Sequence, residues 1–141
     1  MSRIYWDSML FIYWLEDHPQ FSTRVSAIRA RMQERGDELI TSAFTFGEIL
    51  AGAYRKGATH LAGEIGGLLE SVVAEVVPFT RETADHYADI RGRLGIAPAD
   101  AIHLACAAQA NADLFLTNDK RLSGKFVPGI QFIAGVDTAL F

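Results

Sequence analysis

Short apolar segments alternate along the chain with longer segments in which apolar residues recur every three or four positions. Apolar runs of strand length predict β-strands at residues 3–6, 38–43, 75–79 and 114–117, with a further strand at 130–133. Between them, Phe21, Val25, Ile28 and Met32 follow the spacing of one helix face, which predicts a helix over 20–35 that ends at Gly36. Further helices are predicted at 8–15, 45–56, 58–74, after Thr80, and from Pro98 to about 111.

This strand–helix alternation predicts an α/β fold. Strands that alternate with helices favour a parallel sheet covered by helices on both faces. The chain shows no repeat, low-complexity stretch or evident linker, so we expect residues 1–141 to form a single domain.

Composition narrows the class of protein. Half of the 141 residues are hydrophobic, enough for an ordinary core, and the longest apolar run, residues 9–15, is far shorter than the roughly twenty residues that span a bilayer. The single cysteine, Cys106, cannot form an internal disulfide, which fits a reducing cytoplasm. The net charge of −4 counts against a protein that binds nucleic acid through charge alone. We therefore expect a soluble, cytoplasmic protein that does not enter a membrane.

Four acidic residues occupy equivalent places in the predicted pattern. Asp7 ends the first strand, Glu48 follows the second strand in the first turn of its helix, Asp100 lies two residues after Pro98, and Asp119 closes the fourth strand. The carboxyl ends of parallel strands share one edge of a sheet, where ligands bind. All four carboxylates are therefore expected to converge at that edge.

Each of the four also has a purely structural interpretation. Thr45 and Glu48 have the spacing of a capping box, Asp100 suits the positive end of a helix dipole, Asp7 can cap a helix, and Asp119 fits a turn. Together they favour a metal site, because clustered carboxylates repel one another unless protons or cations intervene. Mg²⁺ and Mn²⁺ prefer such oxygen ligands, and they can activate water to hydrolyse a phosphodiester bond.

Four segments that contain these acids resemble the PIN-domain nucleases, and among them the VapC toxins of prokaryotic toxin–antitoxin pairs. The segments are residues 4–8 (IYWDS), 45–49 (TFGEI), 99–105 (ADAIHLA) and 116–122 (LTNDKRL). They follow the family's order over nearly the whole chain. One position departs from the pattern: the family usually has Asn two residues after the first Asp, where this chain has Met9.

The resemblance implies a three-layer α/β/α sandwich around a parallel sheet of four or five strands. It also implies a Mg²⁺- or Mn²⁺-dependent endoribonuclease that acts on RNA, is inhibited by a cognate antitoxin protein, and often forms a homodimer. It assigns Asp7, Glu48, Asp100 and Asp119 to the metal site. Ser8 and Thr117 lie beside them and either orient a carboxylate or water, or serve only as capping and turn residues.

Other interpretations stay open at this point. A PIN-like module that binds RNA or protein without cutting is the main alternative, although a pure binder has no need to gather negative charge where phosphates must go. A phosphatase of the haloacid-dehalogenase type is disfavoured, because its Asp-x-Asp motif would need an acid at Met9. His103 is interpreted as a packed helix residue, and Lys120 and Arg121 as solvated side chains that can also meet RNA phosphates.

Overall fold

The computed structural model describes residues 1–138, and its elements follow the predicted alternation. The strands are β1 (Arg3–Trp6), β2 (Glu38–Ser42), β3 (Glu75–Val77), β4 (Leu114–Thr117) and β5 (Phe132–Gly135). The helices are α1 (Ser8–Leu15), α2 (Ser22–Arg35), α3 (Ala43–Arg55), the 3₁₀ turn η1 (Thr59–Leu61), α4 (Ala62–Val72), α5 (Arg81–Leu94) and α6 (Pro98–Gln109).

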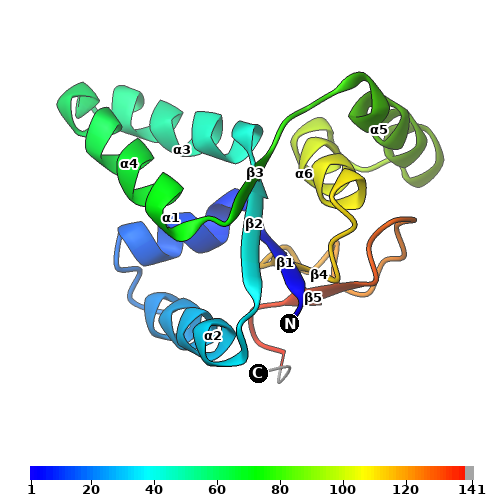
Figure 1. The fold of residues 1–141 in the computed structure, drawn as a ribbon. Coiled ribbons are helices and arrows are strands. Elements are labelled where there is room, and N and C mark those ends of the chain that lie inside the picture. Colours follow the sequence, from blue (N-terminus) through cyan, green and yellow to red (C-terminus); the bar gives the residue numbers. More distant parts are fainter. Residues whose placement is uncertain (139–141) are drawn as a thin grey trace.

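The five strands form one parallel sheet in the order β3-β2-β1-β4-β5. Helices α1 to α4 lie on one side of the sheet, and α5 and α6 lie on the other (Figure 1). The predicted three-layer α/β/α fold is therefore confirmed, with five strands. No helix within residues 1–138 is long and apolar enough to cross a membrane.

The strand residues supply two separate cores, because alternate side chains of a strand point to opposite faces. Ile4 and Trp6 of β1 pack with α1 and α2, whereas Tyr5 packs with Leu104 and Phe115 on the side of α6. All three β1 side chains are at most 1% exposed. Burial on both faces is typical of a central parallel strand.

The strand order places a crevice at the carboxyl end of β1. From β1 the chain builds the sheet outward through β2 and β3, and then crosses to the other side of β1 to form β4 and β5. Ligands bind outside the carboxyl ends of the strands at such a switch point. Asp7 extends the pairing there, since its backbone N–H donates to the Leu116 carbonyl at 3.3 Å. The residues that follow β1 and β4 thus lie side by side.

Several boundaries differ from the prediction; for example, β3 ends at Val77 and not at residue 79. The predicted helix 58–74 is divided into η1 and α4, in a stretch that carries three helix-weakening glycines. The last strand lies two residues later than 130–133, because Ile130 turns into the core just before the edge strand begins. Helix α3 begins at Ala43, so that Glu48 lies in its second turn and not in its first.

Candidate active site

Asp7 is a buried carboxylate at the start of α1. It is the N-cap of this helix, and its Oδ1 accepts a hydrogen bond from the Met9 backbone N–H at 3.1 Å. Its side chain lies at the crevice but Asp7 is only 8% exposed. Burial raises the pKa of Asp7 from 3.8 to about 6, because the charged form loses hydration; the Thr117 hydroxyl and the positive charge of His103 oppose this rise.

Glu48 faces Ser8 and His103 rather than the backbone of its own helix. The N-cap of α3 is Ser42, whose hydroxyl accepts from the Thr45 backbone N–H at 3.2 Å, so the capping box of Thr45 and Glu48 does not form. Glu48 Oε1 accepts hydrogen bonds from Ser8 Oγ at 2.5 Å and from His103 Nε2 at 2.5 Å. Burial raises the pKa of Glu48, but the His103 and Ser8 bonds outweigh it and hold the pKa below its ordinary value.

His103 belongs to a buried hydrogen-bond network beneath Glu48. Its Nδ1 lies 2.8 Å from the oxygen of the Tyr5 hydroxyl, and this hydroxyl donates its proton to Ser42 Oγ at 2.8 Å. Thr45 Oγ1 lies 3.4 Å from the same Nδ1. These four residues are at most 4% exposed. The interpretation of His103 as a packed residue did not include its bond to Glu48. Its position one turn after Asp100, on the same helix face, was the feature of the sequence that could have indicated a role in the site.

Asp100 lies half-buried in the first turn of α6 and is influenced by two other candidate acids. Its pKa is raised, first by burial and then by the negative charge of Asp119, with a smaller contribution from Glu48. The positive charges of His103 and Arg121 oppose this rise. Asp100 and Asp119 also line one small pocket.

Asp119 forms the turn that follows β4 and is paired with Arg121. Its backbone N–H donates to Thr117 Oγ1 at 3.0 Å, and its Oδ1 accepts from the Arg121 backbone N–H at 2.9 Å. The Arg121 guanidinium contacts both carboxylate oxygens, and this hydrogen bonding is the main reason why the pKa of Asp119 is lowered. Thr117 is fully buried at the end of β4 and supports both Asp7 and this turn.

The six predicted site residues are thus all at the carboxyl edge, but they do not form a closed cage. Within residues 1–138, no three acidic, histidine or cysteine side chains are gathered closely enough to hold a metal ion by themselves. The donor set still fits a hard cation. Mg²⁺ is typically held by one or two carboxylates and completes its shell with water and substrate oxygens, so a loosely spaced set of carboxylates is sufficient.

An apolar groove adjoins the carboxylates between α1, α3 and α4. Its volume is about 410 Å³, and Glu48 is one of its lining residues. Lys56 and Glu16, which also line it, form an ion pair. The other lining residues are mainly apolar or small, and include Ile12, Leu15, Ile49, Gly52, Ala53 and Ile65.

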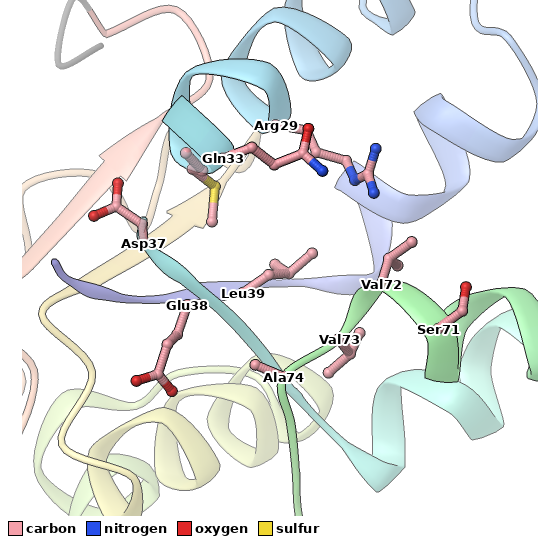
Figure 2. Close-up of a pocket in the computed structure, with 10 residues that line it drawn as sticks. Arg29, Gln33, Asp37, Glu38, Leu39, Ser71, Val72, Val73 and Ala74 are labelled. Carbon is pink, nitrogen blue, oxygen red and sulfur yellow. The ribbon is translucent and has the colours of Figure 1, made fainter. Parts of the chain in front are cut away.

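A second hollow of about 230 Å³ lies at the opposite, amino edge of the sheet. Figure 2 shows Arg29 and Gln33 of α2 on one side of it, Val72 and Val73 on the other, and Leu39 of β2 between them. None of the predicted site residues lines it. The carboxyl edge, and not this hollow, is therefore the candidate active site.

The fold and this acidic edge define an α/β protein with a carboxylate-lined crevice at its topological switch point. Residues 4–125 match the family model described as PIN domain. The chain therefore belongs to the PIN domain family, as the resemblance predicted.

Solved structures with the same fold include components of bacterial complexes. One is VapBC2 from Rickettsia felis bound to a promoter DNA fragment, with a TM-score of 0.76, 15% identity, and coverage of 94% of this chain and 98% of that chain. FitAcB from Neisseria gonorrhoeae matches with a TM-score of 0.66, 25% identity, and coverage of 82% of this chain and 87% of that chain. VapBC-5 from Mycobacterium tuberculosis is a member of the VapBC family of toxin–antitoxin systems. It matches with a TM-score of 0.60, 20% identity, and coverage of 95% of this chain and 99% of that chain. Among curated proteins, none matches the sequence.

The buried charge of Asp7 gives a prediction about stability. The folded protein binds the Asp7 proton more tightly than the unfolded chain, so ionisation of Asp7 lowers the free energy of unfolding as the pH rises from about 4 to about 6. Asp7→Asn keeps a capping side chain without the charge. We expect it to be more stable than the wild type at pH 7.5 in EDTA, by on the order of 2 kcal/mol, with the gain disappearing near pH 4. Urea denaturation at both pH values measures the difference.

Asp119→Asn is the control for this measurement. Because Arg121 lowers the pKa of Asp119, neutralising Asp119 should reduce stability at pH 7.5. A gain for Asp7→Asn that is equal at both pH values would contradict the proposed burial of the Asp7 charge.

Proposed function

We propose that this chain is a Mg²⁺- or Mn²⁺-dependent endoribonuclease and the toxin of a toxin–antitoxin pair. The observation that carries the proposal is the set of acids at the carboxyl edge of a PIN-domain sheet. Asp7 is buried there with a raised pKa, and Asp100 is influenced by the charges of Asp119 and Glu48. Such uncompensated negative charge costs stability, which a divalent cation would recover.

In this proposal Asp7, Glu48, Asp100 and Asp119 hold the cation or cations. The bound cation would lower the pKa of a water molecule and stabilise charge on the cleaved phosphate. Glu48 uses Oε1 for both Ser8 and His103, so in this proposal Oε2 would be the oxygen that holds the cation. Ser8 and His103 therefore act as positioning residues for Glu48, and Thr117 has the same role for Asp7.

The alternative is a non-catalytic PIN-like module that binds RNA or protein. A binding module gains nothing from a carboxylate whose pKa is raised by burial and by neighbouring acids, because that charge repels phosphate. The nuclease is for this reason the better-supported function.

Cleavage of an RNA pool separates the two functions. We expect cleavage by the wild type with Mg²⁺ or Mn²⁺ and none with EDTA. Asp100→Asn should lose roughly 100-fold or more in rate while keeping its fold, since even residues that only support metal ligands cost 10- to 100-fold. Asp85→Asn is the matched control, because it removes an exposed carboxylate of α5 that is paired with Arg81. Full activity in Asp100→Asn would contradict the site, and RNA binding without cleavage would establish the alternative.

The apolar groove supports the antitoxin as partner. We infer that an amphipathic segment of the antitoxin packs its apolar side chains on α1, α3 and α4, and directs a basic side chain to Glu48 in the groove lining. That basic group would compete with the cation for the carboxylates. The similar fold in VapBC complexes supports this role, and the family resemblance further implies a homodimer.

Growth assays test the toxin role and the groove together. Expression of the chain alone should slow growth, Asp7→Asn should relieve it, and co-expression of the antitoxin should restore growth. Gly52→Trp should escape the antitoxin by filling the groove, since a Cβ at Gly52 meets only Arg55 Nη2, at 3.8 Å. Gly63→Trp, at an open position of α4 outside the groove, should still be neutralised. Harmless expression of an active nuclease would contradict the toxin role.

A further inference from the structure

Arg121 occupies both oxygens of a carboxylate that the proposed function assigns to the cation. Its Nε lies 3.0 Å from Asp119 Oδ1, and its Nη2 lies 2.8 Å from Asp119 Oδ2. The Arg121 side chain is nevertheless 81% exposed, against 24% for Asp119. Asp119 is thus closed to a cation while Arg121 stays in place.

This pairing is easily exchanged. An exposed ion pair contributes about 1 kcal/mol or less, so a divalent cation on Asp119 can displace it. The backbone N–H of Arg121 also donates to Asp119 Oδ1, at 2.9 Å, and this bond holds the turn without help from the side chain. The guanidinium can therefore leave without unfolding the loop.

A small pocket lies next to the pair. It has a volume of about 160 Å³, and its charged lining residues are Asp100, Asp119, Arg121 and Lys125. Leu94, Gly95, Ile96, Ala97 and Leu122 complete its lining. It thus places two cationic side chains beside the candidate acids, in a chain whose net charge is −4. A planar guanidinium binds phosphate with the same two-pronged geometry as carboxylate.

We propose that Arg121 is an exchangeable counter-ion that couples cation binding to substrate binding. In the free protein it pairs with Asp119 on the lining of the pocket, and a divalent cation on Asp119 would release it from that carboxylate. In the pocket, with Lys125, it then binds a phosphate of the RNA strand next to the phosphate that is cleaved. This inference rests on the proposed nuclease function and assigns the pocket as an RNA phosphate subsite.

If Arg121 exchanges in this way, one substitution should strengthen cation binding and weaken RNA binding. Arg121→Ala should bind Mn²⁺ several-fold more tightly without RNA, because the competing guanidinium is gone while the turn is kept. The same variant should bind a fluorescent phosphorothioate oligoribonucleotide in Mg²⁺ roughly tenfold more weakly, with a shallower dependence of affinity on salt because a phosphate contact is lost. Calorimetry with Mn²⁺ alone and fluorescence anisotropy with the oligonucleotide provide the two measurements.

Two neighbouring lysines serve as comparisons. Lys125→Ala should weaken RNA binding and leave Mn²⁺ affinity unchanged, since Lys125 lines the pocket but does not pair with Asp119. Lys120→Ala, between Asp119 and Arg121 but outside the pocket lining, should change neither.

The outcomes distinguish this inference from the proposed function. If Arg121→Ala leaves Mn²⁺ affinity unchanged, or leaves RNA affinity unchanged, the exchange is wrong while the nuclease proposal stands. If the wild type binds no Mn²⁺ at all, the metal-dependent nuclease itself is overturned, and the exchange with it.

Discussion

The hydrogen bond between His103 Nε2 and Glu48 Oε1 joins the two helical layers over the carboxyl edge of the sheet. Glu48 comes from α3 on one face and His103 from α6 on the other, while Tyr5 of the central strand contacts His103 Nδ1 from below. A carboxylate oxygen can only accept, so a proton must lie on Nε2. Because His103 is buried and an unpaired buried polar group is costly, this bond ties α6 to α3. Asp100 lies one turn earlier on α6.

The carboxyl edge of the sheet gathers negative charges that lower the stability of the folded chain. Burial opposes the charge of Asp7, and burial, Asp119 and Glu48 oppose the charge of Asp100. Only part of the charge is compensated within the chain, by His103 on Glu48 and by Arg121 on Asp119. We propose that cations neutralise the remaining negative charge at the carboxyl edge of the sheet. Membership of the PIN domain family and the position of the acids at the switch point agree with this proposal.

Local patterns in the sequence were sufficient for the fold and for the placement of the acids. The strands were found because Ile4, Tyr5 and Trp6 and their counterparts are buried on both faces, and the turn at Gly36 was found because its positive φ favours glycine. The start of α3 was wrong because Ser42 and Thr45 are both good capping residues, and only the packing of Thr45 against Thr41 decides between them.

The contacts of the site could not be predicted in the same way. His103 meets residues that are 55 and 98 positions away, and no local pattern reports such a bond. Ser8 was predicted to support a neighbouring carboxylate, and it contacts Glu48, 40 positions away. For Arg121 the spacing indicates solvation or a phosphate contact, and it does not show that the side chain returns to Asp119.

The most direct test of this account is to locate the imidazole protons of His103 by long-range ¹H–¹⁵N NMR in the metal-free protein. The account predicts a protonated Nε2 that donates to Glu48, with a correlation that changes in Glu48→Ala and persists in Glu48→Gln, whose amide oxygen can still accept. A ring that carries its proton on Nδ1 alone, with Nε2 bare, would leave no donor toward Glu48 and would contradict the bond on which the site depends.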